Sequence, residues 1–438
     1  MIKNAAELIR AGEMPKEKQI RKEVVDILEF VLKSADPADL TREILKKINF
    51  SRYQRIFVIG AGKATYRMAW AAERFLGKRL TGGTINVPQA IKNGHLKKIK
   101  LTLAGHPFTT ASGVAGTKKI IELIKEAGPK DLILALFSGG ASALFELPVA
   151  GITLPDQIKT TELLIRSRAT IQEINSVRKH LSQVKGGQLA QKSQRTNLMA
   201  LYLSDVVGDD LATIASGPTV PDATTFGQAV KILKKYNLWS KTPADVKRYL
   251  SDGQKGLNPE TIKTKQSNTK NILISGRQTL IASAEKKARR LGYRISLIEK
   301  ELVGDTEKKG RELLKAALKG KIDHKKIFMA AGETTFEVRT NKPGGRLQQM
   351  GLAVLSGLKH GLIFVALASD GVDGVGPEKI GGVIIDQKNF IKAGALRIDI
   401  KKTLQTNDSY NFFKKVGGQI KTGYVGTNLG DLILLIRF

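Results

Sequence analysis

Hydrophobic positions near the N-terminus recur at the spacing of an α-helix. Between residues 17 and 48 the apolar side chains would share one helix face. They are Val24, Ile27, Leu28, Val31 and Leu32. The segment Asp36-Pro37-Ala38-Asp39 then interrupts the pattern and offers an N-cap for a second helix that runs through Leu45. The chain is therefore predicted to begin with two amphipathic helices.

Further along, short apolar runs alternate with longer amphipathic segments. The runs are residues 55–59, 131–137 and 197–203, and a helical pattern follows the first of them from Ala64. Strands that alternate with helices in this way are typical of a parallel sheet with helices on both faces. We therefore predict an α/β protein whose N-terminal domain is a doubly wound, Rossmann-like parallel sheet.

A polar stretch separates this region from a second set of apolar runs. Residues 240–268 contain Pro243, Gly253, Gly256 and Pro259 without sustained periodicity, which is typical of a domain junction. Beyond it, helices are expected at 278–291 and 305–318 between buried strands. These strands are expected at 271–274, 295–298, 326–330 and 362–368. We predict domains 1–266 and 267–438, the second an α/β domain with a mixed sheet.

The composition narrows the class of protein. The chain has 438 residues, 42% of them hydrophobic, and no cysteine, so disulfides, thiolate metal sites and cysteine nucleophiles are excluded. None of the five histidines lies four residues from another, which disfavours a histidine zinc site. No apolar run reaches the roughly 20 residues that span a bilayer, and the N-terminus lacks a secretory pattern. We expect a cytoplasmic protein without membrane association.

The formal net charge of +32 is larger than one anionic substrate requires. Nucleic-acid-binding proteins usually gather basic residues on one face or arm, whereas Lys and Arg are scattered here and never occur three in a row. Compositional bias is the favoured explanation, and a functional polyanion surface stays open as the second.

Two glycine-rich segments directly follow predicted strands. One holds Gly60, Gly62 and Lys63, and the other is Ser138-Gly139-Gly140. Backbone amides of such turns, a following helix N-terminus and a lysine can together hold a phosphate or carboxylate. The first segment is neither a Walker A loop nor a dinucleotide fingerprint, because Ala64 and Thr65 stand where those motifs require other residues. A tight turn with a solvated lysine is the alternative interpretation.

Acidic and basic groups follow other strands at similar positions. The segments are Asp205 with Asp209 and Asp210, Glu333-Thr334, Gly344-Gly345-Arg346, Asp370, and Asn407-Asp408. Carboxylates at strand ends suit Mg²⁺ binding or acceptance of a hydroxyl proton, and an arginine on a flexible loop suits phosphate. Because loops at sheet ends meet at one edge, these groups are predicted to form ligand sites.

In these segments the chain resembles the class II glycerate kinase family, which has an N-terminal kinase region and a C-terminal MOFRL domain. The resemblance is most specific in residues 173–190 and 204–222, and the glycine-rich and acidic segments fit in the family's order. It implies two α/β domains with the active site between them. It also implies phosphoryl transfer from ATP to the 2-hydroxyl of D-glycerate, with Mg²⁺, to give 2-phosphoglycerate.

The resemblance implies roles for individual residues. Lys63 and Arg346 would stabilise the transferring phosphoryl group, and Mg²⁺ would bind Asp205 or Asp370, with the other acid accepting the hydroxyl proton. Arg178 or Lys185 would bind the glycerate carboxylate. The remaining substrate- or nucleotide-binding candidates are Gly60, Gly62, Ser138, Gly139, Gly140, Glu333, Thr334, Asn407 and Asp408.

Four segments depart from the family pattern. They are Leu347-Gln348-Gln349 in place of Asn-Gln-Glu, Phe108-Thr109-Thr110 without an aspartate, Gly276-Arg277 in place of Ser-Asn, and residues 375–378 without Pro-Thr-Asp. The net charge and the altered segment after Arg346 keep one alternative open, a polyanion- or nucleic-acid-binding protein on a degenerate kinase scaffold. A second alternative is an NAD-linked hydroxypyruvate reductase acting on the same metabolite, which the missing third glycine after Gly62 disfavours. A homo-oligomer is compatible with the sequence.

Overall fold

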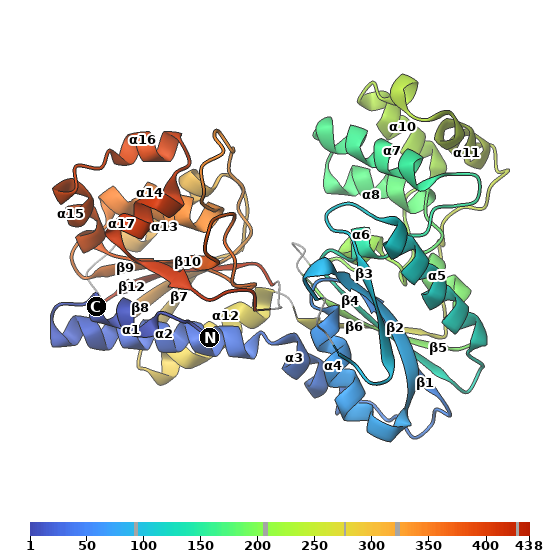
Figure 1. Ribbon diagram of the computed structural model, residues 1–438, viewed down its shortest axis with the longest axis horizontal. Helices are drawn as coiled ribbons and strands as arrows, with labels where there is room; N and C mark the ends of the chain where they lie inside the picture. Colours follow the sequence, from blue (N-terminus) through green and yellow to red (C-terminus); the bar gives the residue numbers. More distant parts are fainter. Residues whose placement is uncertain (92–94, 205–208, 276, 320–324, 426–428) are drawn as a thin grey trace. The chain divides into compact units, whose positions relative to one another are not determined.

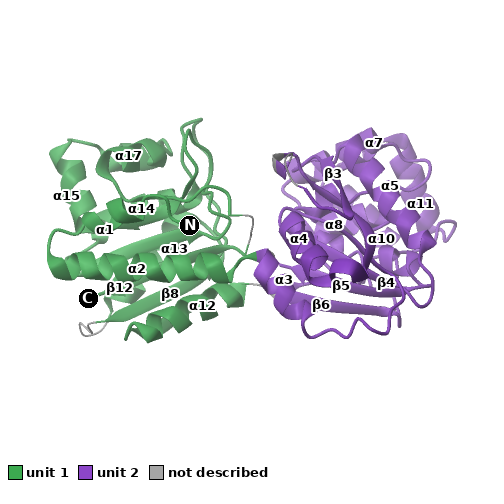
Figure 2. Ribbon diagram, turned by 60° about the horizontal axis from the view of Figure 1, so that its bottom comes forward, with its two compact units in different colours: residues 1–36, 275–438 green, residues 37–274 purple. Residues whose placement is uncertain are grey.

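The computed structural model describes residues 1–91, 95–204, 209–275, 277–319, 325–425 and 429–438. They form two compact units (Figure 2). Residues 37–274 form one, called here the N-terminal unit, and residues 1–36 with 275–438 form the other, the C-terminal unit. The division predicted from the sequence, 1–266 and 267–438, differs from this partition mainly in the placement of the first 36 residues.

The N-terminal unit is built on a six-stranded sheet in the order β3-β2-β1-β4-β5-β6. The pairs β2–β3, β1–β2, β1–β4 and β4–β5 are parallel. The strands are β1 (Ile56–Ala61), β2 (Leu80–Pro88), β3 (Ile99–Ala104), β4 (Leu132–Ser138), β5 (Asn197–Leu203) and β6 (Thr269–Ser275). Every residue of β1 and β4 is buried, as continuous apolar runs in a sheet covered on both faces require. The predicted doubly wound sheet is confirmed.

Helices of the N-terminal unit cover its sheet and form a separate helical cluster. Helix α5 packs on the sheet through Ile120 and Ile124, in one apolar cluster with Phe137 and Tyr202. Helices α7, α8, α10 and α11 share a second apolar cluster (Figure 1). The helices are α3 (Pro37–Leu45), α4 (Thr65–Leu76), α5 (Ala111–Glu126), α6 (Ala141–Leu144), α7 (Leu154–Arg166), α8 (Ile171–His180), α9 (Gln188–Lys192), α10 (Phe226–Lys235) and α11 (Ala244–Gln254).

The C-terminal unit has a mixed sheet in the order β11-β10-β9-β12-β8-β7. Strands β7 and β8 pair in parallel, and the pairs that involve β9, β10, β11 and β12 are antiparallel. The strands are β7 (Arg294–Leu302), β8 (Lys326–Gly332), β9 (Leu362–Ala368), β10 (Ile380–Ile385), β11 (Gln419–Lys421) and β12 (Asp431–Arg437). The predicted mixed sheet is confirmed.

Helices lie on both faces of this second sheet (Figure 1). Helices α2 and α12 lie on one face, and α13, α14 and α17 lie on the other. The helices are α1 (Ala5–Arg10), α2 (Pro15–Ser34), α12 (Arg277–Arg290), α13 (Thr306–Leu318), α14 (Arg346–Val354), α15 (Gln387–Ala395), α16 (Ile400–Gln405) and α17 (Ser409–Val416).

The N-terminal segment is an integral part of the C-terminal unit. The amide of Lys3 donates to the carbonyl of Lys421 at 2.7 Å, and the Tyr293 hydroxyl donates to Glu23 at 2.7 Å. Arg21, which is 3% exposed, pairs with Asp386 at 2.5 Å. Helix α2 also buries Val24, which belongs to the apolar face that the sequence predicted. These long-range contacts explain why residues 1–36 separate from the segment that follows them.

Two expectations near the predicted junction are wrong. Residues 271–274 were assigned to the second set of strands, but they lie in β6, at the edge of the N-terminal sheet. Residues 240–268 contain helix α11, which packs through Val246 and Leu250 against the helical cluster. The polar composition hid this helix because only its narrow inner face is apolar.

Candidate active site

In the N-terminal unit, the turns after β1 and β4 are built against each other. The Lys63 amide donates to the Gly139 carbonyl at 2.9 Å, and the Ala64 amide donates to Ser138 Oγ at 3.0 Å. A Cβ on Gly62 would lie 2.1 Å from Ser138 Oγ, so only glycine allows the approach. The two glycine-rich segments that the sequence singled out therefore form one paired turn at the carboxyl edge of the sheet. Gly60 supports it from within β1, where a Cβ would lie 2.1 Å from the Leu136 carbonyl oxygen.

Gly140 marks the point where Lys63 and His106 meet. Gly140 has φ +82°, and a Cβ there would lie 2.9 Å from His106 Cδ2 and 3.3 Å from Lys63 Cγ. The lysine side chain is half-buried. The imidazole, which follows β3, therefore lies beside the lysine, and both side chains gather over the paired turn.

His106 is expected to stay neutral across the physiological pH range. Desolvation of the ring, with the nearby charge of Lys63, lowers the pKa of His106 to about 4. In an NMR titration its ring signals should change with a midpoint well below the ordinary value of about 6.5. The Lys63→Met variant should raise the midpoint because it removes the positive neighbour. A midpoint near 6.5 in both proteins would show that the two side chains are not in contact.

The two cations proposed for the substrate carboxylate have different surroundings. Lys185 is fully buried and pairs with Glu146 at 3.0 Å, and its Nζ also donates to the Phe145 carbonyl at 2.6 Å. Arg178 is half-buried, and its Nη2 donates to the Ser142 carbonyl at 2.5 Å. Arg178 also lines a small cavity with Phe108 and Thr109. The structure therefore leaves Arg178 as the cation that a ligand can reach, with Lys185 inside the protein.

Breaking the Lys185–Glu146 pair should destabilise the N-terminal unit strongly. Lys185→Met would leave the buried carboxylate of Glu146 uncompensated, and removal of one partner from a buried pair typically costs about 3–5 kcal/mol. Burial lowers the pKa of Lys185 to about 8, against the opposing effect of Glu146, so the pair weakens in alkaline solution. Urea unfolding should show the loss, and the double variant Lys185→Met with Glu146→Gln should recover most of it. Equal stability of the single and double variants would contradict the buried pair.

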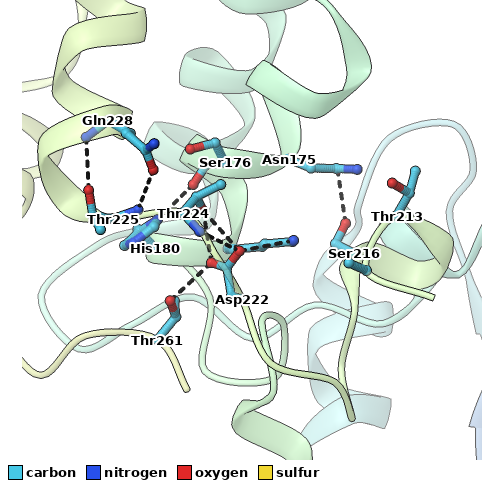
Figure 3. A network of polar contacts seen from close by, with 12 residues as sticks. Asn175, Ser176, His180, Thr213, Ser216, Asp222, Thr224, Thr225, Gln228 and Thr261 are labelled. Atoms are coloured by element: carbon cyan, nitrogen blue, oxygen red, sulfur yellow. Dashed lines mark hydrogen bonds and ion pairs between the residues drawn. The ribbon is translucent and has the colours of Figure 1, made fainter. Parts of the chain in front are cut away.

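A polar network fixes the segments in which the family resemblance is most specific (Figure 3). Asp222, which is 1% exposed, accepts from Lys179 at 3.1 Å and from Thr261 at 2.9 Å. Ser216 donates to Asn175 at 3.1 Å and lies 3.0 Å from Ser142 Oγ. The network therefore connects α8 with the turn after β4 and holds Arg178 beside that turn.

Asp205 lies outside the described residues. Nearby, Asp210 has a local role, because its carboxylate accepts from the Ala212 amide at 3.0 Å and from Thr213 Oγ1 at 2.6 Å. This arrangement is the loop capping that aspartate commonly provides.

In the C-terminal unit, Arg346 lies at the centre of an acidic cluster. Its Nε and Nη2 donate to the two carboxylate oxygens of Asp431 at 2.7 and 3.0 Å, and its Nη1 pairs with Glu333 at 3.1 Å. Asp431 is 3% exposed, whereas the Glu333 side chain is 40% exposed. Asp431 therefore anchors the guanidinium from inside the unit, while Glu333 holds its outer edge.

The electrostatics of this cluster raise the pKa of Arg346 and also the pKa of its partner Asp431. Burial opposes the charge of Arg346, but Asp431 and Glu333 outweigh it and raise the arginine pKa. Burial also raises the pKa of Asp431 to about 7, with Arg346 acting in the opposite direction and Glu333 adding to the rise. Three acids, including Asp373, therefore compete for one arginine.

Neighbouring polar residues, among them the predicted site residue Thr334, hold the start of α14 at Arg346. Asp373 accepts from the amides of Leu347 and Gln348 at 3.0 and 2.8 Å, which caps the start of α14. Thr334 is 2% exposed and donates to Thr306 Oγ1, which in turn donates to the Arg346 carbonyl. Asp373 and Thr334 are buried, and their hydrogen bonds hold the backbone around Arg346 in place.

Asn407 and Asp408 lie at the turn that precedes α17. A Cβ on Gly344 would lie 3.2 Å from the Asn407 carbonyl oxygen, so this turn packs against the arginine loop. The Asn407 side chain accepts from the Arg339 amide at 2.7 Å, and its buried Nδ2 has no hydrogen-bond partner within the described ranges. Asp408 is half-buried and accepts from Asn411 at 2.7 Å. Asn407 therefore lies beside the arginine loop, and Asp408 has a local partner.

Two departures from the family pattern lie inside the unit. Leu347 is fully buried in the apolar cluster of the C-terminal sheet. Gln349 is also fully buried, and its Nε2 donates to Glu307 at 3.1 Å and to the Leu404 carbonyl at 2.9 Å. The amide is a suitable partner for Glu307, which would repel a second carboxylate. Leu347 and Gln349 therefore pack inside the C-terminal unit, next to Arg346 in the sequence.

Asp370 follows β9 at the sheet edge. One carboxylate oxygen accepts from the Val372 amide at 2.9 Å, and the side chain is half-buried. Across the described ranges, no three His, Asp or Glu side chains gather into a metal-ligand cluster. In the same part of the chain, no helix is both long and apolar enough to span a bilayer.

Several residues of these sites were missed by sequence reasoning. Asp431 opens the last apolar run, and an acid at the start of a buried strand could have drawn attention to it. Glu146 carries no comparable signal because it lies in no recognisable motif. His106 was quoted only as part of a motif, and its position beside Lys63 depends on the pairing of β3, β2 and β1.

These sites belong to an α/β protein in which turns at the sheet edges carry a lysine in one unit and an arginine in the other. Residues 23–251 match the family described as "Domain of unknown function (DUF4147)", and residues 326–431 match the MOFRL family. The chain therefore belongs to the class that combines these two regions.

Individual relatives are more specific. The chain is 37% identical over 391 residues to the glycerate 2-kinase of Pyrococcus horikoshii, with 87% of each chain covered. It is 35% identical over 423 residues to the D-glycerate 2-kinase of Thermotoga maritima, covering 95% of this chain and 98% of that one. The crystal structure of glycerate kinase from Thermotoga maritima superposes with a TM-score of 0.87 at 34% identity, covering 96% and 100% of the two chains. The chain is a member of the glycerate 2-kinase family.

Proposed function

We propose that the protein transfers the γ-phosphoryl group of ATP to the 2-hydroxyl of D-glycerate, with Mg²⁺, and releases 2-phosphoglycerate. Family membership supports glycerate as the acceptor, because relatives that cover most of the chain carry that name. Phosphoryl transfer depends mainly on alignment and charge neutralisation, and the cationic and glycine-rich groups of the site are suited to both.

The observation that carries the proposal is the paired turn of the N-terminal unit. It brings a lysine, an imidazole and glycine-rich backbone to one edge of a parallel sheet. Ligands of such sheets bind at the carboxyl ends of the strands. A neutral His106 can donate one hydrogen bond to a phosphate oxygen without repelling the positive charge of Lys63. A bound phosphate would then have both a charged donor, Lys63, and an uncharged donor, His106.

The remaining residues have supporting roles in this proposal. Arg346, fixed by Asp431, would neutralise charge on the transferring group, with the exposed Glu333 giving way to phosphate oxygens. Arg178 would bind the glycerate carboxylate, held in place by its bond to Ser142. Lys185 would act as a positioning residue, since its charge is used by Glu146.

Magnesium in such enzymes is usually bound by one or two carboxylates together with substrate phosphates. Asp370 fits this requirement, because it is an oxygen donor at a strand end with one oxygen oriented by the Val372 amide. Asp205 is the second candidate from the sequence. When bound, the ion would neutralise charge on the nucleotide phosphates, and the acid that does not hold it would accept the hydroxyl proton.

Product identification tests the proposal directly. The protein is incubated with Mg-ATP and a panel of small hydroxy acids, and the products are analysed by ³¹P and ¹³C NMR. Phosphorus coupling to carbon 2 of glycerate is expected, and coupling to carbon 3 would assign the other hydroxyl. A parallel assay follows NADH absorbance with hydroxypyruvate. Turnover of NADH without phosphorylated glycerate would replace the kinase by the reductase.

A further inference from the structure

Arg277 is a buried arginine with two nitrogens that find no acceptor among the described residues. It is the first residue of α12, and it is 6% exposed. Its Nε and Nη2 are both buried, and no described residue accepts a hydrogen bond from either of them. Nearly all buried polar groups in proteins are hydrogen-bonded, and a buried charge without a partner is especially unfavourable. A ligand that binds there would supply the missing acceptors.

The guanidinium lies at the sheet edge that carries the arginine site. A Cβ on Gly430 would lie 3.1 Å from Arg277 Nε and 3.0 Å from the Gly332 carbonyl oxygen. Gly430 directly precedes Asp431, which anchors Arg346, and Gly332 directly precedes Glu333. Arg277 therefore borders the same strand ends as the acidic cluster, at the carboxyl end of β8 and the amino end of β12.

The helix that begins at Arg277 contributes to the same position. Helix α12 has 14 residues, and the first amides of a helix have no acceptor within it. Together with the helix dipole they favour an anion at this end. The Arg277 guanidinium and the first amides of α12 are therefore both hydrogen-bond donors that favour an anion. Nε and Nη2 of Arg277 lie on one edge of the guanidinium, which is the fork geometry with which arginine binds phosphate.

We propose that Arg277 and the first turn of α12 form a phosphate subsite that binds a phosphate group of the nucleotide. This inference rests on the proposed kinase function and adds a further cation to it. Within the cluster, Arg346 is occupied by Asp431 and Glu333, whereas Arg277 Nε and Nη2 have no acceptor among the described residues.

Binding of inorganic tripolyphosphate tests the subsite without any need for turnover. Calorimetry on the full chain should show that Arg277→Met weakens tripolyphosphate binding about tenfold or more, the size expected for lost charge-assisted hydrogen bonds. The KM for ATP should rise similarly, while the affinity for D-glycerate should stay unchanged. Loss of D-glycerate affinity alone would mean that the subsite binds a carboxylate and would overturn the proposal.

Thermal stability separates this role from a structural one. Arg277→Met removes an unpaired buried charge, so its Tm should equal or exceed that of the unchanged protein. A lower Tm with unchanged tripolyphosphate affinity would identify a structural arginine. Arg277→Lys keeps the charge and loses the fork, and it should bind tripolyphosphate with intermediate affinity. If the lysine variant bound as weakly as the methionine variant and both had a lower Tm, the subsite would be rejected.

A matched control comes from the same helix. Arg289 is exposed and pairs with Glu285, so Arg289→Met removes one charge from α12 away from the subsite. Its tripolyphosphate affinity should be unchanged. Equal weakening in both variants would show that the general positive charge of the protein, not Arg277, attracts the anion. Since tripolyphosphate binding does not require glycerate phosphorylation, the subsite and the kinase proposal can fail independently.

Discussion

Lys63→Ala should lower kcat for glycerate phosphorylation about 100-fold or more while leaving the fold unchanged. Removal of one group that stabilises developing charge typically has an effect of this size. The turn itself does not depend on the lysine side chain, because it is held by the Lys63 amide and by Ser138. Steady-state kinetics with Mg-ATP and D-glycerate would measure the loss, and thermal unfolding would confirm that Tm is retained.

Two further variants make the result specific. Lys118→Ala removes an exposed lysine from α5 of the same unit, and it should leave kcat unchanged. Lys63→Arg keeps the charge but changes its shape, so partial activity is expected. If Lys63→Ala kept near-normal turnover, Lys63 would not contact the transferring group.

Arg346→Met is expected to lower both turnover and stability. The kinetic loss should again be about 100-fold or more, because the charge at the start of α14 disappears. Stability should fall by about 3 kcal/mol, the lower end for broken buried pairs, since the guanidinium is 30% exposed and Asp431 is 3% exposed. Chemical unfolding at several pH values would measure this part.

The stability loss should depend on pH in a defined direction. Burial raises the pKa of Asp431 to about 7 even with Arg346 present, and loss of the arginine would raise it further. A carboxyl whose pKa is raised on folding favours the folded state when protonated. The deficit of the variant should therefore be largest above the variant's own raised pKa, should shrink as the pH falls toward about 7, and should stay small below it, where Asp431 is protonated in both proteins.

A second substitution distinguishes the two effects of Arg346. The double variant Arg346→Met with Asp431→Asn no longer buries an unpaired charge, so its stability should largely return. Its turnover should stay low, because the cation is still absent. Recovery of turnover in the double variant would assign Arg346 a purely structural role, and an undiminished stability of the single variant would contradict the buried pair.

The sequence predicted those features that depend on local pattern. The strand before Gly60 and the strand before Ser138 follow from continuous apolar runs, and their parallel pairing follows from the strand–helix alternation. The paired turn could be anticipated because both segments end neighbouring strands. Arg346 was placed on a flexible loop by its two glycines, whereas the helix α14 that begins at Arg346 was not predicted.

Contacts between distant segments could not be predicted in the same way. Asp431 lies 85 residues from Arg346 in the sequence, and no local pattern links them. Glu146 and Lys185 are 39 positions apart by their numbers, and only the fold makes them a pair. Lys185 was therefore proposed as a ligand-binding residue from its motif, although its charge is used within the protein. The burial of Arg277, and the lack of an acceptor for its Nε and Nη2 among the described residues, could be found only from the structure.

The division of the chain also bears on how the protein folds as it is synthesised. Helix α2 is synthesised before residues 37–274, but the sheet on which its apolar face packs is completed only when β12 has been made. Residues 37–274 can complete their own sheet in the meantime, since domains generally fold as units during translation. Val24 and its apolar neighbours on α2 are therefore expected to stay uncovered until β12 follows.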